Sequence, residues 1–85
     1  MKYQVVVSKK AKKELLKIDR QQSKRIWDWL YKKLDGCKNP YFSGNALKGL
    51  WRYRVGCYRI LADIDDDKII INIIQIGHRH GIYKN

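Results

Sequence analysis

Three arginines between residues 50 and 64 have a spacing that could create a binding site for phosphate. This stretch reads as two strands joined at Gly56-Cys57, and a glycine at the first position of a two-residue loop is typical of a type II′ hairpin. The turn would place Arg54 opposite Arg59, and opposed residues point to the same side of a sheet. One side would therefore be basic, with Arg52 beside this pair. The other side would belong to a core formed by Trp51, Tyr53, Val55, Tyr58, Ile60, Ala62 and Ile64.

Such a group of guanidinium ions is unfavourable without an anion. Two like charges about 5 Å apart repel each other by roughly 1 kcal/mol in water, and by several times more at a lower effective dielectric. Arginine is also the residue that binds phosphate through two parallel hydrogen bonds. The hairpin therefore favours a phosphate site, and the alternative interpretation is a basic face that is simply hydrated.

The end of the sequence adds groups that could transfer protons. His78, Arg79, His80 and Tyr83 follow a strand that we expect beside the strand of Arg59, with His78 on the same side as Arg59. Attack of a ribose 2′-OH on its own 3′-phosphate cleaves RNA, and it needs a base, an acid and positive charge on the phosphate. Histidine, with a reference pKa of about 6.5, can be base or acid. The alternatives are that the histidines are ordinary surface groups and that Tyr83 anchors the chain on the sheet.

Two helices are expected before the hairpin. A short strand at residues 3–7 is followed by Ser8, a good N-cap, and a second helix would begin after Asp19 and stop at Gly36. Residues 37–49 contain proline and several glycines and are expected to form a loop. The buried stripes of the two helices would consist of Ala11, Leu15 and Ile18, and of Ile26, Trp27, Leu30 and Leu34.

A third strand, residues 68–76, would follow a turn at Asp65-Asp66-Asp67. The order β-α-α-β-β-β, with two antiparallel helices on one face of a small, mainly antiparallel sheet, is an α+β fold. Residues 1–85 would form a single domain. Alternation along the third strand would place Ile69, Ile71 and Ile73 on the core side, and Ile70, Asn72, Ile74 and Ile76 on the arginine side.

The charge of the chain narrows the class of its partners. Its 85 residues carry a formal net charge of +11, and the pI is near 9.9. A balance this basic points to nucleic acid, an anionic membrane surface or an acidic protein. The N-terminal residues are too poor in apolar side chains for a signal peptide, and no apolar run approaches the roughly 20 residues of a spanning helix. We therefore expect a soluble, cytoplasmic protein that does not bind a membrane.

Metal and cofactor sites are not evident in the sequence, so neither is expected. Cys37 and Cys57 lack the spacing of metal ligands, and two free thiols in a reducing compartment are the expectation. The acidic residues 63–67 lack the loop length of a calcium site and read as a hydrated turn. The lysines of the first helix could contact nucleic acid or form a hydrated face.

The hairpin Leu50-Trp51-Arg52-Tyr53-Arg54-Val55-Gly56-Cys57-Tyr58-Arg59-Ile60-Leu61 resembles the central signature of the RelE/ParE toxin superfamily. Asp65-Asp66-Asp67-Lys68, followed by Gly77-His78-Arg79 and Tyr83, resembles its C-terminal half, so the resemblance covers nearly the whole chain. The superfamily consists of small toxins from bacterial and archaeal toxin–antitoxin pairs. Its RelE-like branch cleaves mRNA in the ribosomal A site without a metal, whereas its ParE-like branch inhibits DNA gyrase.

The resemblance implies roles for individual residues. Arg59 and Arg79 match arginines that stabilise the phosphate during cleavage. Tyr83 matches a tyrosine that stacks on the substrate or orients it. Arg52 and Arg54 match two basic residues, often lysines, that bind phosphate and help to activate the 2′-OH.

The resemblance leaves the general base open. Arginine is a poorer proton acceptor than lysine because its pKa is higher, so His78 or His80 would have to act as the base in this chain. Lys48 and His80 are further candidates for RNA binding. The full arginine set together with Tyr83 favours the RNA-cleaving branch, because ParE-like members usually lack part of it.

We therefore expect the toxin of a type II toxin–antitoxin pair, acting as a metal-independent, ribosome-dependent endoribonuclease. Its substrate would be mRNA on the ribosome, and the basic helix faces would contact ribosomal RNA. Its partner would be an acidic, RelB-like antitoxin, which suits both the charge of +11 and the apolar residues on the arginine side. The alternatives are a ParE-like toxin that inhibits gyrase without cutting RNA, and an inactive relative that binds nucleic acid.

Overall fold

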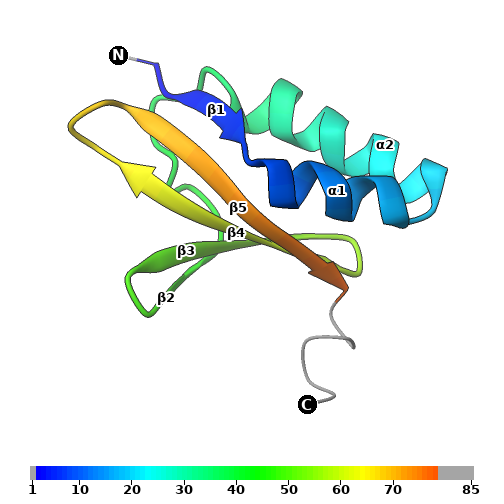
Figure 1. Cartoon of the computed structure of the whole chain (residues 1–85). Helices are drawn as coiled ribbons and strands as arrows, with labels where there is room; N and C mark the ends of the chain where they lie inside the picture. The colour runs from blue at the N-terminus through cyan, green and yellow to red at the C-terminus, as the bar shows by residue number, and fades with distance from the viewer. Residues whose placement is uncertain (1, 79–85) are drawn as a thin grey trace.

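Across residues 2–78, which are those that the structure describes, two helices lie on one face of a five-stranded sheet (Figure 1). The structure is a computed structural model. The helical elements are α1 (Lys9–Lys17), α2 (Arg20–Trp29) and a π-helical turn that continues α2, η1 (Leu30–Leu34). The strands are β1 (Gln4–Val7), β2 (Asn45–Leu47), β3 (Leu50–Val55), β4 (Tyr58–Asp65) and β5 (Ile70–His78). The α+β class predicted from the sequence is confirmed.

Both helices begin at the predicted caps. The Ser8 hydroxyl accepts a hydrogen bond from the Ala11 amide at 3.1 Å, and the Asp19 carboxylate accepts from the first free amides of α2. The helical segment ends before Gly36, whose φ is +82°, as predicted. The π-helical turn was not predicted; in it the Asp35 amide donates to the Leu30 carbonyl at 2.8 Å, one residue further back than in an α-helix.

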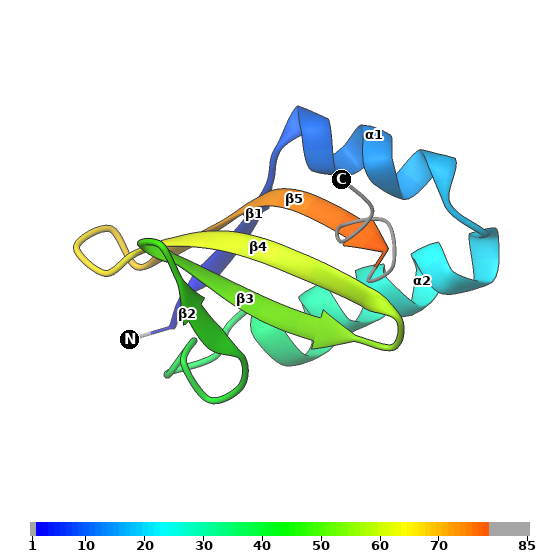
Figure 2. The ribbon, with the colours of Figure 1, turned by 90° about the horizontal axis from the view of Figure 1, so that it is seen from below.

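The sheet has the strand order β1-β5-β4-β3-β2, which can be followed in Figure 2. β1 runs parallel to β5, and the other neighbours are antiparallel. The β3–β4 hairpin has the predicted register, with Arg54 opposite Arg59. Gly56 has φ +60° while Cys57 has a negative φ, which identifies the predicted type II′ turn.

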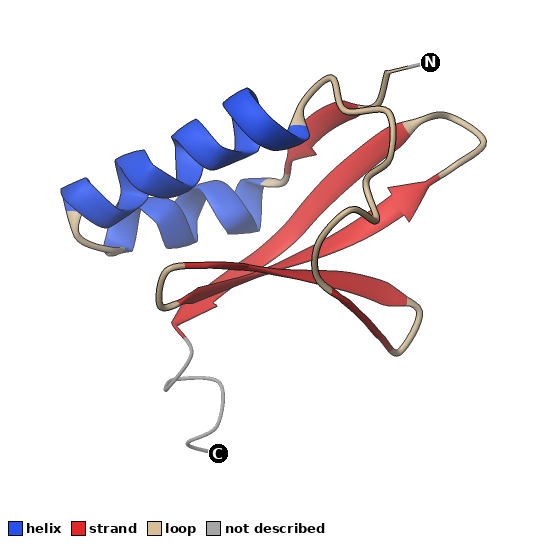
Figure 3. Ribbon diagram, turned by 180° about the vertical axis from the view of Figure 1, so that it is seen from behind, coloured by secondary structure: helices blue, strands red, loops and turns tan. Residues whose placement is uncertain are grey.

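Residues 37–49 are not entirely a loop, because they contain the edge strand β2 (the loop before it is tan in Figure 3). β2 and β3 are joined by Lys48 and Gly49, with φ +48° and +82°, so both central residues are left-handed as in a type I′ hairpin. Lysine rarely adopts this conformation, so the hairpin could not be predicted with Lys48 at this position. β2 pairs only with residues 50–52, which leaves the second half of β3 as a free edge within the described part of the sheet.

A β-bulge changes the register of the last strand. Leu61 pairs with Gln75 and Ala62 with Ile73, so Ile74 is an extra residue in β5. Every residue after it is moved to the opposite side from the one that alternation predicts. Ile76 is therefore in the core, 3% exposed and opposite Ile60, and its predicted place on the arginine side is wrong.

Ile69 also differs from its predicted place on the core side. It has φ +51° and belongs to the turn before β5. The core between the helices and the sheet consists of Val5, Val7, Ala11, Leu15, Ile26, Leu30, Leu34, Tyr53, Val55, Tyr58, Ile60, Ala62, Ile71, Ile73 and Ile76. Trp27 and Trp51, predicted for this core, are partly buried at its margin. Neither helix in the described part of the chain has the length and apolar character that crossing a membrane requires.

The acidic turn between β4 and β5 is held by its own hydrogen bonds. Asp65 accepts from the amides of Asp67 and Lys68 at 3.1 and 3.0 Å. Asp66 accepts from the hydroxyls of Tyr3 and Tyr41 at 2.7 and 2.9 Å. The bond to Asp66 raises the pKa of Tyr3 to about 12, because it holds the phenol in its protonated form. Asp66 therefore joins the turn to the residue before β1 and to the loop before β2.

Candidate functional site

The sheet surface away from the helices, here called the open face, carries the arginines of the hairpin. Arg54 and Arg59 are directly opposed across β3 and β4, and Arg52 lies two residues from Arg54 on the same side. In Figure 2 these strands are seen from below, with the helices behind and beside the sheet. The structure thus brings together Arg52, Arg54 and Arg59, the arginine patch, as the hairpin register predicted.

The three arginines differ in exposure. Arg54 is exposed and Arg52 is half-buried, whereas Arg59 is only 7% exposed and its Nε atom is shielded from solvent. A charged group that is shielded from water interacts more strongly with an opposite charge nearby than a hydrated one does. Arg59 is therefore the group of this patch that would stabilise a bound phosphate most.

Charge is unevenly distributed along the open face. The arginine pair is next to the β3–β4 turn, and Asp63 and Asp65 lie at the other end of β4. The two carboxylates would repel an anion, so a phosphate is favoured at the turn end of the sheet. The open face is therefore positively charged at the end of the β3–β4 turn and negatively charged at the opposite end of β4.

A mainly polar row of residues crosses the open face through Arg52 of the patch. The register aligns Asn45, Arg52, Leu61 and Gln75 on four consecutive strands. The amides of Asn45 and Gln75 can both donate and accept hydrogen bonds, as contacts to nucleobases or ribose require. Sequence reasoning missed both residues, because their place in the row depends on β2 and on the bulge, and neither has a clear local signal.

His78 lies on the other side of the sheet from Arg59. It pairs with Tyr58, and the two rings meet edge to face with centroids 5.1 Å apart. The β5 residue opposite Arg59 is Gly77. The prediction that His78 shares a side with Arg59 is therefore wrong, because the extra residue Ile74 reverses the alternation before it reaches His78.

Of the remaining predicted site residues, the structure describes Lys48, which is not joined to the patch. Lys48 is in the β2–β3 turn, at the opposite end of β3 from Arg54, and a six-residue strand spans about 20 Å. Arg79, His80 and Tyr83 lie outside the described residues. Among residues 2–78, no group of three histidine, cysteine or acidic side chains is arranged to hold a metal ion.

A second cationic surface lies around the free edge of β3. A groove of about 420 Å³ separates α2 and η1 from the β3–β4 turn. The Arg25 guanidinium lies against the turn, because a Cβ atom placed on Gly56 would be 3.1 Å from its terminal nitrogen. Arg54 lines this groove as well as the open face. The groove, called the basic groove below, is lined by Arg25, Asp28, Trp29, Lys32, Lys33, Arg54, Val55 and Gly56.

The basic groove was not singled out from the sequence. Arg25 and Lys32 are seven residues apart, which places them on one side of the helix, but the sequence does not show that this side meets the hairpin turn. The lining of this groove contains four cationic side chains and one carboxylate, Asp28. The cationic surface therefore continues from the open face, around the edge of β3, to the second helix.

The chain is similar to toxins of one class. The family model described as the ParE toxin of type II toxin–antitoxin systems, parDE, matches residues 5–83. No curated protein shows significant sequence similarity to the chain.

Solved structures of toxin–antitoxin proteins share the fold. The RelBE2 toxin–antitoxin complex from Mycobacterium tuberculosis matches with a TM-score of 0.83 and 25% identity, over 93% of this chain and 100% of that one. The RelE–RelB complex from the archaeon Pyrococcus horikoshii matches at 0.70 and 19%, over 93% and 97% of the two chains. The isolated RelE toxin of E. coli matches at 0.66 and 17%, over 89% and 83%.

Proposed function

Since this chain belongs to the ParE toxin family of type II toxin–antitoxin systems, and so to the RelE/ParE superfamily, we propose that it is a ribosome-dependent endoribonuclease that cleaves mRNA in the A site. The observation that carries the proposal is the pair of opposed arginines on the open face, Arg54 and the shielded Arg59. Two opposed guanidinium groups are stabilised by a phosphate between them.

The proposed reaction needs no group beyond RNA and the protein. The ribose 2′-oxygen attacks its own 3′-phosphorus while a base removes its proton. The bond from phosphorus to the 5′-oxygen then breaks, and an acid protonates that oxygen. The products are a 2′,3′-cyclic phosphate and a 5′-hydroxyl. Negative charge grows on the phosphate oxygens, which is where a guanidinium group stabilises the transition state.

The arginine patch supplies the charge in this scheme. Arg59 stabilises the transition state, and Arg52 and Arg54 hold the RNA backbone beside it. The proton transfers fall to His80 and Tyr83, because arginine is a poor proton acceptor. Arg79 is a second stabilising cation, as the resemblance implies. His78 is left out, because its ring lies on the other side of the sheet from Arg59.

The proposal includes two partners. Ribosomal RNA contacts the basic groove, because the groove continues the cationic surface of the patch and a polyanion can span both. An acidic, RelB-like antitoxin neutralises the toxin, which fits the charge of +11 and the toxin–antitoxin complexes among its structural relatives.

A single substitution tests the centre of the site. Arg59→Ala is expected to lower the cleavage rate of ribosome-bound mRNA by about 10²-fold or more, the effect of removing one preorganised donor. Arg59→Lys keeps the charge but loses the two parallel hydrogen bonds, so it should fall between wild type and Arg59→Ala. Lys10→Ala, which removes one positive charge from α1, is the matched control and should cleave normally.

Mapping mRNA 5′ ends in a purified translation reaction, with and without ribosomes, provides the measurement. Thermal unfolding checks that each variant is folded. Cleavage that is unchanged in folded Arg59→Ala would refute this site.

Gyrase inhibition is the second candidate, and the observation that favours it is that the matching family model is that of ParE toxins. It predicts DNA breaks and inhibited supercoiling by purified gyrase, with no cut in ribosome-bound mRNA. An RNA-binding relative without activity predicts neither effect, and no growth defect on expression.

A further inference from the structure

Leu61 is an apolar residue in the middle of the open face. In the row that crosses this face it lies between Arg52 on β3 and Gln75 on β5. It is also two residues from Arg59 on β4 itself. Adjacent strands are about 4.8 Å apart, and two residues of a strand span about 7 Å. The half-buried Leu61 is therefore an apolar floor within reach of a nucleotide whose phosphate is held by Arg59.

The position on β5 beside Arg59 has no side chain. It is Gly77, and Gln75 is the next residue of β5 on the open face. A glycine inside a strand often marks a place where a ligand approaches the backbone closely. The space next to the guanidinium group is thus free of a β5 side chain, and Gln75 borders it on the side of Leu61.

The amide of Gln75 is available to a ligand. Within residues 2–78, no hydrogen bond joins its side chain to another residue. Asn72, which is also on the open side of β5, instead donates to the Asp63 carbonyl at 3.2 Å. A glutamine amide has one acceptor and two donors, so it can bind the N6 and N7 atoms of adenine at the same time.

The charges of the open face determine which part of a nucleotide lies over Leu61. On this face β4 carries in succession a cation, an apolar side chain and a carboxylate, which are Arg59, Leu61 and Asp63. The Asp63 carboxylate repels a phosphate, whereas Arg52 and Arg54 attract one along β3. The sugar-phosphate backbone is therefore favoured along β3, and the uncharged base is favoured across β4 towards Gln75.

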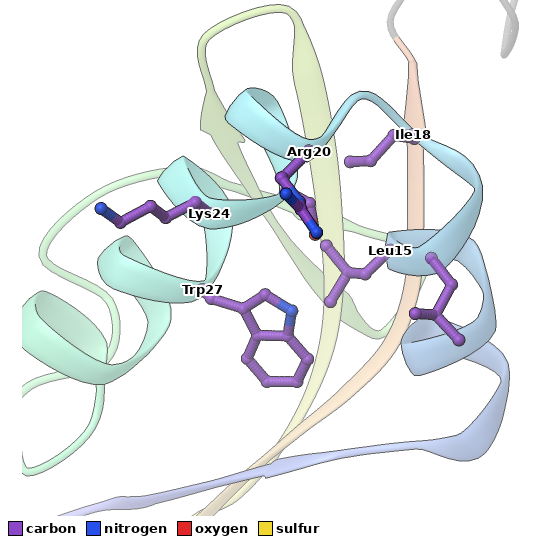
Figure 4. A pocket seen from close by; sticks show the side chains of 7 residues that line it. Leu15, Ile18, Arg20, Lys24 and Trp27 are labelled. Carbon is purple, nitrogen blue, oxygen red and sulfur yellow. The ribbon is translucent and has the colours of Figure 1, made fainter.

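A tryptophan that could stack on a base lies on the other side of the sheet. Trp27 lines an apolar cleft between α1 and α2, next to Leu15 (Figure 4). The two helices cover the face of the sheet opposite the open face, so a nucleotide whose phosphate is at the arginine patch does not reach this cleft (Figure 1). A base beside the patch therefore contacts Leu61 and Gln75 rather than the indole of Trp27.

We propose that Leu61 and Gln75 form a nucleobase site that selects adenine in the nucleotide next to the phosphate held by Arg59. The Gln75 amide donates a hydrogen bond to N7 and accepts one from the N6 amino group, while the base packs on Leu61. The inference rests on the proposed RNA substrate, but it concerns binding and does not require that the RNA is cut. Gln75 is thus a specificity residue.

RNA that cannot be cut separates this site from catalysis. Pentamers of 2′-O-methyl uridine with one of the four bases at the centre have no free 2′-hydroxyl, and fluorescence anisotropy measures their affinity for the purified full-length chain. The wild type should bind the adenine pentamer at least about fivefold more tightly than the cytosine pentamer, the lower limit for a bidentate base contact.

Two substitutions of Gln75 test the contact. Gln75→Ala should bind the adenine and cytosine pentamers alike. Gln75→Glu keeps the shape of the side chain but can only accept hydrogen bonds, so it should favour cytosine, whose N4 amino group is a donor. Thermal unfolding checks that each variant is folded, and the Gln75→Glu result decides the question even if Gln75→Ala does not fold.

Gln4→Ala is the matched control, because Gln4 is an exposed glutamine on the same face, opposite Ile70 and so about 16 Å from Gln75 along β5. It should keep the adenine preference of the wild type. The proposal would be overturned if the wild type bound all four pentamers equally or preferred another base, or if the adenine preference survived in Gln75→Glu. If the preference depends on Gln75 but ribosome-bound mRNA is not cut, the base site stands and the endoribonuclease proposal fails.

Discussion

Arg59 and His78 belong to neighbouring strands, yet their side chains leave the sheet on opposite sides. Arg59 points to the open face, where it is opposed to Arg54, and His78 points to the side of Tyr58. A general base must lie within hydrogen-bond reach of the hydroxyl that it deprotonates. An imidazole that contacts Tyr58 does not meet this condition for a phosphate held at the arginine patch.

This geometry predicts that the two histidines near the end of the chain differ in importance. His78→Ala should keep the cleavage rate within roughly tenfold of wild type, whereas removal of a general base costs about 10²-fold or more. His80→Ala is the comparison, because His80 is the remaining imidazole. Initial rates on ribosome-bound mRNA at several pH values provide the measurement. If His78→Ala lost most of its cleavage rate, and the rate no longer depended on pH, His78 would be the general base. The base would then lie on the other side of the sheet from Arg59, which would contradict this scheme.

At the scale of elements, the features that depend on a few neighbouring residues could be predicted from the sequence. The β3–β4 register follows from one glycine with φ +60° in a two-residue turn, so the pairing of Arg54 with Arg59 could be predicted from the sequence. The caps at Ser8 and Asp19 are equally local. The fold class could be predicted for the same reason, because it depends on element types and their order.

The bulge in β5 had no such signal. The sequence from Ile69 to Ile76 is rich in isoleucine. With or without a bulge at Ile74, the pairing of β5 with β4 would place apolar side chains on both sides of the strand. Contacts with β1, β4 and α1 select the pairing in which Ile71, Ile73 and Ile76 are all buried. The positions of His78 and Gln75 follow from that choice, so that part of the site could not be predicted from the sequence.

The bulge can be tested through the two isoleucines that it distinguishes. Ile76→Ala should lower the free energy of unfolding by about 2–4 kcal/mol, because it removes a fully packed core side chain. Ile74→Ala, at the extra and only half-buried residue, should cost less than half as much. Urea denaturation of both variants measures the difference. Equal losses, or a larger loss for Ile74→Ala, would contradict the register.

At the scale of the whole molecule, the question is whether a charge of +11 acts as a general attraction for RNA or through located sites. A general attraction depends on net charge and is insensitive to which lysine is removed. A located site releases a counterion for each phosphate that it neutralises, so the salt dependence of binding counts its contacts. The basic groove has the features of a located site, since its cations come from α2, η1 and β3 and face one another.

Two double variants with the same net charge distinguish these possibilities. Arg25→Ala/Lys32→Ala removes two cations from the basic groove, and Lys10→Ala/Lys13→Ala removes two from α1. For binding of single-stranded RNA, the groove variant should reduce the slope of log K against log salt by about 1.4, or about 0.7 for each lost phosphate contact. The α1 variant should leave the slope close to that of wild type. Equal changes in both variants would mean that the groove contributes only its share of the overall charge, and that the arginine patch alone determines where RNA binds.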